Sequence, residues 1–572
     1  MKATDYIARA LHEKNVTAVF EMSGGMITHL LDSIHLYGKT RIVSTHHEQA
    51  AAFAAEGYGR MTGVPGVAMA TSGPGATNLL TGVGSCFFDS TPAVFITGQV
   101  NRHEQKGNKA IRQLGFQETD IVSMAAPITK HATMVQNPES LQESLEHAFE
   151  TATSGRPGPV LLDIPMDVQR TQIEPKPVSP TKVGKVGSDE MVPFLEETLN
   201  ALNQAKFPLI LIGGGIRSGR CVEMLLRLIE KLGVPVVHSL MAVDVLPFLH
   251  PLRVGMIGTY GNRWANIALH KSDCILVLGS RLDVRQTGSD TKAFSKGKSF
   301  FHVDCESGEM NNRVVGCRTL VSELRTFLDF AVAQVFRQVE KDDWQFEIGE
   351  SRKQWPDDGE LPGIEGINPN RFMHALSAAT PSASAYVVDV GQHQMWAAQS
   401  LRLGADQRFL TSGGMGSMGF ALPTAIGVSV AVPDRPCVMI AGDGGFQTNI
   451  QELETVRRYH LPIKMIVINN QCHGMVRQFQ ESYFEGRYQS TFWGYSAPDF
   501  ERVADSYRIP ARTCRLSEDI NGAMDWLSQD LSAPCLLQVM VDTFANAYPK
   551  VAFGCPISEM EPFAKPIEME ST

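Results

Sequence analysis

The stretch that decides the fold runs from residue 437 to 470 and reads CVMIAGDGGFQTNIQELETVRRYHLPIKMIVINN. Two apolar runs, Cys437–Ala441 and Met465–Ile468, predict buried strands, and the segment between them predicts a glycine-rich turn followed by a helix. Continuous rather than alternating apolar runs indicate strands that are buried on both faces. We therefore expect a parallel sheet covered by helices on both sides.

Both predicted strands are followed by polar residues, Asp443 after the first and Asn470 after the second. The carboxyl ends of parallel strands meet at one edge, where open α/β sheets bind ligands. Oxygen donors beside a glycine-rich backbone suit Mg²⁺ bridging a diphosphate, and Gly444 and Gly445 allow close approach at the start of a helix. On the residues alone, an alternative remains open, in which Asp443 only caps the helix and the asparagines form a turn.

The same pattern continues through the rest of the chain. Two polar stretches rich in glycine and proline, 174–189 and 341–370, predict linkers. They divide the chain into 1–173, 190–340, 366–550 and a tail, 551–572. The fold class that we expect is α/β, with three doubly wound parallel-sheet domains. Seven further apolar runs predict strands: 67–70, 93–97, 160–164, 208–212, 234–238, 274–278 and 387–390.

Composition limits the class of protein. The 572 residues are 43% apolar and 20% charged, which is typical of a globular protein, and the net charge of −10 argues against nucleic-acid binding. Residues 420–433, the longest weakly polar stretch, fall short of the ~20 apolar residues that a membrane span needs. The N-terminus predicts an amphipathic helix rather than a signal peptide. Ten scattered cysteines without a CxxC pair favour a reducing, cytoplasmic location.

Familiar hydrolase and nucleotide signatures are incomplete. The P-loop pattern fails at Lys292, the zinc pattern HExxH fails at Ala51, and no GxSxG occurs. The turn Gly213-Gly214-Gly215 follows an apolar run but lacks the last glycine of the dinucleotide fingerprint. These failures disfavour hydrolase chemistry by the usual routes.

The 27-residue spacing from Asp443 to Asn470 is typical of thiamine diphosphate (ThDP) enzymes. Further pieces occur in matching order: HHEQAAAFAAEGYGR (46–60), TSGPGATN (71–78), GFQETD (115–120), DVGQHQMWAAQ (389–399), GGMGSMGFALPTAIG (413–427) and NNQCHGMVRQFQ (469–480). With these, the sequence resembles the ThDP-dependent acetolactate synthase family over nearly the whole chain. The resemblance implies three domains, namely a pyrimidine-binding, a central Rossmann-like and a diphosphate-binding domain.

The resemblance implies a catalytic role for Glu48, which would hydrogen-bond the pyrimidine ring of the cofactor. Without the surrounding motif, Glu48 reads as a solvated carboxylate at a helix end. Phe116 and Gln117 resemble residues that line the active site from the neighbouring subunit. A homodimer is then the smallest active unit, and a homotetramer is common in the family.

The remaining cofactor residues are implied in the same way. One group would hold the diphosphate, a second lies under the thiazolium ring, and a third, including a backbone carbonyl, ligates magnesium. In that order, these residues are Gly391, Gln392 and His393; Gly416 and Met418; and Asp443, Asn470 and the carbonyl of Cys472.

The implied reaction is decarboxylation of a 2-keto acid, usually pyruvate, and transfer of the two-carbon unit to a carbonyl acceptor. With pyruvate as acceptor the product is 2-acetolactate. The candidate substrate residues are His473, Met475 and Phe479, and Phe479 stands where biosynthetic members carry a tryptophan that favours 2-ketobutyrate. A keto-sugar acceptor and a pyruvate oxidase-type flavoenzyme remain open as alternatives.

FAD is a further cofactor that the resemblance implies, in a structural rather than a redox role. The matching residues are Arg156, Gly213, Gly214, Gly215 and Arg281. The chain departs from the family at His302 and at Cys317, where acidic residues are usual. No surface signal for a regulatory subunit is readable, and the tail resembles family tails that cover the active site.

Overall fold

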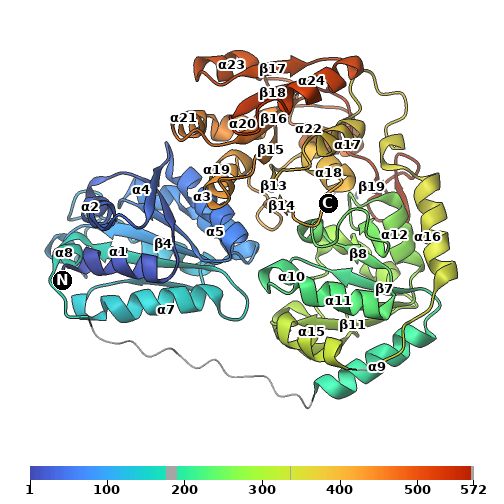
Figure 1. The fold of residues 1–572 in the computed structure, drawn as a ribbon, viewed down its shortest axis with the longest axis horizontal. Helices are drawn as coiled ribbons and strands as arrows, with labels where there is room; N and C mark the ends of the chain where they lie inside the picture. Colours follow the sequence, from blue (N-terminus) through green and yellow to red (C-terminus); the bar gives the residue numbers. More distant parts are fainter. Residues whose placement is uncertain (176–189, 335, 568–572) are drawn as a thin grey trace.

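Three six-stranded parallel sheets form the framework of the molecule, as predicted (Figure 1). The computed structural model describes residues 1–175, 190–334 and 336–567. The first predicted linker, 174–189, therefore lies almost wholly outside the described residues. Figure 1 shows the first domain beside the third, with the central domain below the third.

The first and third sheets share one topology. The first has the order β2-β1-β3-β4-β6-β5 and the third the order β14-β13-β15-β16-β18-β17, which is 2-1-3-4-6-5 in chain order for both. The first sheet consists of β1 (Ala18–Met22), β2 (Arg41–Ser44), β3 (Gly66–Ala70), β4 (Ala93–Gln99), β5 (His131–Met134) and β6 (Pro159–Pro165). The third consists of β13 (Ala385–Val388), β14 (Arg408–Leu410), β15 (Cys437–Gly442), β16 (Ile463–Asn469), β17 (Ala511–Cys514) and β18 (Cys535–Met540).

The central sheet has a different order, β12-β11-β10-β7-β8-β9. Read from the other edge it is 3-2-1-4-5-6, the order of dinucleotide-binding folds. Its strands are β7 (Pro208–Ile212), β8 (Val236–His238), β9 (Arg253–Met256), β10 (Cys274–Leu278), β11 (Ser299–Asp304) and β12 (Arg318–Val321).

Each of the nine predicted runs overlaps a strand. The prediction for 234–238 starts two residues early, and that for 387–390 ends two residues late, because Asp389 already belongs to the loop after β13. The helix predicted after Asp443 is broken into α20 (Asp443–Thr448), a 3-10 turn, and α21 (Leu453–Arg458). The predicted amphipathic N-terminus is α1 (Ala3–Glu13).

The first and third domains share a continuous apolar core. Helices α3 (Glu48–Thr62) and α19 (Ala421–Ala431) pack face to face between the two sheets, and the rings of Phe53 and Phe420 lie 5.4 Å apart, edge to face. Their backbones approach so closely that a β-carbon on Gly57 would lie 2.3 Å from the carbonyl oxygen of Thr424. This packing fixes the position of the Glu48 end of α3.

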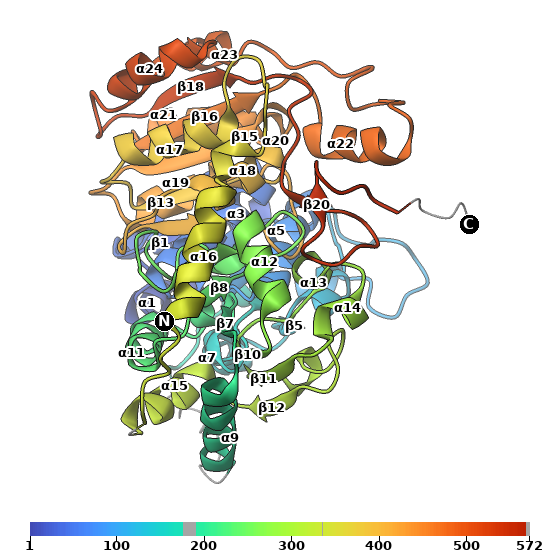
Figure 2. The ribbon, with the colours of Figure 1, turned by 90° about the vertical axis from the view of Figure 1, so that its right-hand side faces the viewer.

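Part of the second predicted linker is a helix. Residues 342–354 form α16 (Asp342–Gln354), because Trp344 and Ile348, four residues apart, bury one face against the central domain (Figure 2). The tail forms a short hairpin of β19 (Lys550–Val551) and β20 (Met560–Glu561), docked through a hydrogen bond from the Val551 N–H to the Thr259 carbonyl at 2.7 Å. Among the described residues, no helix has the length and hydropathy to cross a bilayer.

Candidate active site

Asp443 lies at the carboxyl edge of the third sheet, directly after β15. It is 2% exposed, and its Oδ2 accepts a hydrogen bond from the Tyr495 hydroxyl at 3.0 Å. Burial raises the pKa of Asp443 to about 7, since a charged carboxylate is poorly solvated there. A cation at this position would therefore favour the ionised form.

Asn470 leaves the same edge from the neighbouring strand, because Gly442 of β15 pairs with Ile468 of β16. Its side-chain nitrogen donates to Gln392 Oε1 at 3.3 Å, and its Oδ1 accepts from the Cys472 N–H at 3.3 Å. Asp443 and Asn470 thus present a carboxylate and an amide at one sheet edge, which are ligand types that Mg²⁺ prefers.

Cys472 follows in the same loop, and its thiol is directed to the Thr543 carbonyl at 3.4 Å. Burial raises the pKa of this thiol to about 11, so it stays protonated at neutral pH. The backbone carbonyl of Cys472, the predicted ligand, accepts the Gly474 N–H at 2.9 Å and retains its second lone pair. The described residues contain no cluster of three or more His, Cys, Asp or Glu side chains suited to a metal, so a site here depends on amide and carbonyl oxygens.

The turn after Asp443 is tightly enclosed. A β-carbon on Gly444 would lie 2.7 Å from His473 Cε1, and one on Gly445 would lie 2.7 Å from Asp389 Oδ1. The backbone N–H groups at the start of α20 thus lie between His473 and Asp389 with no room for side chains.

Helix α18 (Gln392–Ser400) begins beside this turn, directly after Gly391. His393 Nε2 accepts the Gly442 N–H at 3.2 Å, and burial lowers the pKa of His393 to about 3, so the ring is neutral. Gln392 donates to the Ala545 carbonyl at 2.9 Å and accepts from Asn470. Two helix N-termini therefore converge on the Asp443 edge, an arrangement that favours an anionic ligand.

The loop that carries Gly416 and Met418 is fixed at both ends by buried carboxylates. Asp89 accepts the N–H groups of Gly413 (3.0 Å) and Gly414 (2.6 Å), and Asp389 accepts those of Gly419 (3.0 Å) and Ala421 (2.9 Å). Met418 lies between these anchors and is 39% exposed.

The three predicted substrate residues lie at the start and along the length of α22 (Gly474–Tyr483). His473 is half-buried and its ring packs edge to face on Tyr495, with centroids 4.4 Å apart. Met475 is half-buried, and Phe479 is 42% exposed, packed 4.8 Å from the ring of Tyr483. His473 is thus adjacent to the Asp443 turn, whereas Phe479 lies farther along the helix.

Glu48 lies at the corresponding edge of the first sheet, as the first residue of α3. It is 7% exposed and accepts a hydrogen bond from Asn78 at 2.9 Å, which excludes the reading as a solvated helix-end carboxylate. Gln117 packs against Gly73, whose β-carbon would lie 3.0 Å from the Gln117 Cβ, and a β-carbon on Gly75, two residues on, would lie 3.2 Å from Glu48 Oε1. Phe116 is 80% exposed. Within the described part of the chain, no hydrogen bond or ion pair joins Glu48 to the Asp443 edge.

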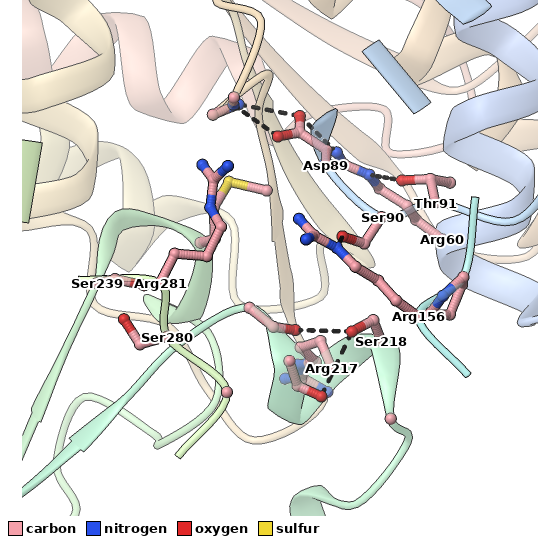
Figure 3. A pocket seen from close by; sticks show the side chains of 18 of the residues that line it. Arg60, Asp89, Ser90, Thr91, Arg156, Arg217, Ser218, Ser239, Ser280 and Arg281 are labelled. Carbon is pink, nitrogen blue, oxygen red and sulfur yellow. Dashed lines mark hydrogen bonds and ion pairs between the residues drawn. The ribbon is translucent and has the colours of Figure 1, made fainter. Parts of the chain in front are cut away.

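A cavity of about 860 Å³ lies where the three domains meet, and Arg156, Gly214, Gly215 and Arg281 line it (Figure 3). Arg156 donates to Ser90 at 2.8 Å and pairs with Glu306 at 2.9 Å and with Glu309. Gly213 instead packs beneath the turn, since its β-carbon would lie 2.1 Å from the Gly279 carbonyl oxygen.

His302, the predicted departure from the family, is 1% exposed with both ring nitrogens unpartnered, and burial lowers its pKa. Asp304, two residues on at the end of β11, supplies an acidic side chain to the cavity lining. Side chains two residues apart on a strand lie on the same face of the sheet, so the position of His302 is a signal that predicts Asp304 as its acidic neighbour.

The sequence patterns do not predict every residue at these sites. Asp389 falls within a run that predicts a strand, although its polar side chain at the end of an apolar run is the same signal that indicates Asp443. Asp89 and Tyr495 belong to loops far from the segments that they bind, and no local pattern predicts such contacts.

Three family models match the chain: thiamine pyrophosphate enzyme, N-terminal TPP binding domain (residues 1–124), central domain (195–330) and C-terminal TPP binding domain (389–539). The acetolactate synthase isozyme 2 large subunit of Escherichia coli (strain K12) is 36% identical over 560 residues, covering 98% of this chain and 99% of the relative. The acetolactate synthase of Arthrospira platensis is 36% identical, covering 96% of each, and the acetolactate synthase large subunit of Corynebacterium glutamicum is 35% identical, covering 98% and 90%. The chain belongs to the acetolactate synthase family of thiamine pyrophosphate enzymes.

Proposed function

We propose that this protein decarboxylates pyruvate with ThDP and Mg²⁺ and joins the two-carbon unit to a second pyruvate, giving 2-acetolactate. The observation that carries the proposal is the buried pair Asp443 and Asn470 on adjacent strand ends, in a chain whose curated relatives are acetolactate synthases.

Asp443, Asn470 and the Cys472 carbonyl would hold Mg²⁺, and the N–H groups at Gly444 and Gly445 would bind the diphosphate. Gly391, Gln392 and His393 would complete that end, with Gly416 and Met418 beneath the thiazolium ring. ThDP supplies the carbanion that makes loss of CO2 from a 2-keto acid feasible.

Glu48 would hold a proton at the pyrimidine nitrogen of the cofactor. Asn78 supports this role, because its amide donates to Glu48 Oε2 and leaves Oε1 for a ligand. The low exposure of Glu48 keeps water away from that proton.

The active unit would be a homodimer, or a homotetramer built from dimers. Each site would combine the Glu48 edge of one subunit with the Asp443 edge of its partner. Within the described residues of one chain, the neighbouring His46 donates its N–H to Glu452 of the third domain at 2.9 Å, but no hydrogen bond or ion pair joins Glu48 itself to Asp443 or Asn470. The exposed Phe116 and the neighbouring Gln117 would then face the partner's site.

Several relatives are named large subunits, so a separate regulatory subunit is part of the proposal. Light scattering of the purified protein tests the oligomeric state.

FAD would occupy the cavity between the three domains. The turn at Gly214 and Gly215 supports this assignment, as do the arginines 156 and 281 and the acidic Asp304 in the lining. The visible absorption spectrum of the purified protein, before and after FAD is added, tests it.

All ten cysteines are unpaired, which supports a reducing, cytoplasmic location.

A keto sugar is a second candidate acceptor, favoured by one observation. His473, half-buried against Tyr495, puts a hydrogen-bonding ring next to the Asp443 turn, where a hydroxyl-rich acceptor could bind.

The decisive experiment follows pyruvate loss and acetolactate formation in parallel, with purified protein, ThDP and Mg²⁺. We expect one acetolactate for every two pyruvates consumed, and neither change in Glu48→Gln. Slow pyruvate loss with little acetolactate would indicate that the acceptor is a compound other than pyruvate. Pyruvate loss coupled to reduction of an electron acceptor would indicate the oxidase-type alternative, and no pyruvate loss would refute the donor assignment.

A further inference from the structure

A second cavity, of about 240 Å³, lies at the joint between the central and third domains. Its walls include Phe248, which precedes β9, Trp264 on α12 (Arg263–Lys271), Arg352 on α16, and Arg402, which follows α18. The Phe248 N–H donates to the Leu403 carbonyl at 2.9 Å, so the two domains are linked at this point. Figure 2 shows α16 extending along the central domain toward α17 and α18. The length of α18 separates this cavity from Gln392 and the Asp443 edge.

Three arginines surround one aromatic ring beside this cavity. The guanidinium carbons of Arg253, Arg352 and Arg402 lie 5.2, 5.0 and 5.6 Å from the centroid of Phe248. The distance between any two of these guanidinium carbons is therefore at most the sum of their distances to the Phe248 centroid. Arg352 also lies 5.5 Å from the ring of Trp264. Three like charges this close together repel one another unless acidic groups or a bound anion offset them.

Few acidic groups offset these charges. Among the described residues, neither Arg253 nor Arg352 has a side-chain hydrogen bond or ion pair, although Arg253 is only 6% exposed and its Nε is buried. Burial and the charge of Arg352 lower the pKa of Arg253 to about 9. Arg402 donates to His374 Nδ1 at 3.2 Å, which requires a ring nitrogen without a proton.

Two acids line this cavity, Asp357 and Asp358, and the carboxylate of Asp357 is already in use. It accepts from His374 Nε2 at 2.9 Å and from the Ser400 hydroxyl. The neighbouring Asp358 pairs with Arg371 at 3.1 Å, on the outer side of α17 (Pro369–Ala379). The two carboxylates of this cavity, each with another partner, are therefore outnumbered by three guanidinium groups.

We propose that this cavity, the arginine–aromatic pocket, binds a small organic anion, with Arg352 and Arg402 on its oxyanion and Phe248 and Trp264 against its apolar part. Guanidinium groups form paired N–H bonds to carboxylate and phosphate oxygens, and aromatic walls favour a compact apolar body. A volume of about 240 Å³ lies below the ~300–1,000 Å³ of drug-sized ligand sites, so the ligand is smaller than a nucleotide. The shared chemistry is a carboxylate or a phosphate monoester.

The test is isothermal titration calorimetry of the full-length protein, loaded with ThDP and Mg²⁺, with three probes: inorganic phosphate, phenyl phosphate and benzoate. We expect saturable binding of phenyl phosphate or benzoate, whichever oxyanion the pocket prefers, and at least tenfold weaker binding of that probe in Arg352→Gln and in Arg402→Gln. Arg502→Gln, which removes an 89% exposed charge on another helix, is the matched control and should bind as the unmodified protein does.

Binding of phenyl phosphate alone would identify a phosphate ester as the ligand class, and binding of benzoate alone a carboxylate. Absence of saturable binding for all three probes would overturn the proposal. It would also be overturned if both pocket variants bind normally, or if Arg502→Gln weakens binding as much as they do. Melting temperatures of the variants show whether each is folded, and because both replaced side chains are partly or fully exposed, we expect little change.

Discussion

The first and third sheets have the same strand order, yet they present different side chains at the same edge. In the first sheet, β3 is followed by Thr71 and β4 by Val100, whereas in the third, β15 is followed by Asp443 and β16 by Asn470. The topology thus provides an edge suited to binding, and the residue one step beyond each strand determines what the edge can bind.

The helices after the second strand of each sheet extend this comparison. Helix α3 begins with the buried Glu48, whereas α19 is preceded by the loop that Asp89 and Asp389 hold. Under the proposed function, the first edge handles a proton and the third binds metal and diphosphate. The two roles can then be removed separately by substitution.

Glu48→Gln should give the largest effect. The amide keeps the shape and the contact with Asn78 but cannot exchange a proton, so we expect kcat to fall by about 10²–10⁴. The Kd for ThDP, measured by fluorescence titration, should change no more than about threefold. A comparable loss of ThDP affinity would mean that the two edges do not have separate roles.

Asp443→Asn should produce the opposite pattern. Loss of the charged ligand should weaken Mg²⁺-dependent ThDP binding by about 100-fold, since even supporting residues of metal sites contribute 10- to 100-fold. The matched control is Thr71→Ala at the equivalent position of the first sheet, where we expect binding within about threefold of the unmodified protein. If both variants lose affinity equally, the difference between the edges does not lie in these residues.

The pH dependence of cofactor binding should be smaller, about tenfold. Because burial raises the pKa of Asp443 to about 7, a proton competes with Mg²⁺, and the Kd for Mg²⁺-ThDP should fall as pH rises from 6 to 8. By the same linkage, the free protein should lose stability as pH rises from about 4 to about 7, since the folded state holds this proton more tightly than the unfolded state.

Tyr495→Phe shows whether the pH dependence of binding comes from ionisation of Asp443 or from ionisation of the cofactor itself. The Tyr495 hydrogen bond lowers the Asp443 pKa, so its removal should shift the pH dependence of binding to higher pH. ThDP titrates identically with both proteins, so superimposable profiles would show that Asp443 is not the titrating group.

Sequence patterns predicted the third-sheet edge more fully than the contacts that support it. Asp443 and Asn470 each follow an apolar run, which is local information. The anchors of the Gly416–Met418 loop come from Asp89 in the first domain and Asp389 in the third, and Asp89 lies more than 300 residues away in the chain. The sequence predicts a linker where α16 lies, because only two apolar residues on an otherwise polar segment bury the face of this helix. Contacts between domains depend on packing that no single segment encodes.

The smallest effect that we expect is on the preference for the acceptor substrate. The question is which of the two edges selects the acceptor. Phe479→Trp enlarges a ring on α22 of the third domain that is 42% exposed, and Phe116→Trp enlarges a ring of the first domain that is 80% exposed and is proposed to face the partner's site. If the third-domain edge selects the acceptor, Phe479→Trp alone should raise incorporation of 2-ketobutyrate relative to pyruvate, by about fivefold, or on the order of 1 kcal/mol. The measurement is a competition assay in which both hydroxyacid products are separated and counted.

Phe484→Trp is the control for added bulk, since its ring lies 5.9 Å from that of Phe479 and is equally exposed, at 43% against 42%. A shift in Phe116→Trp but not in Phe479→Trp would move acceptor selection to the first-domain edge. The two edges would then divide the reaction differently, with the third domain confined to holding the cofactor and the first acting on both proton and acceptor.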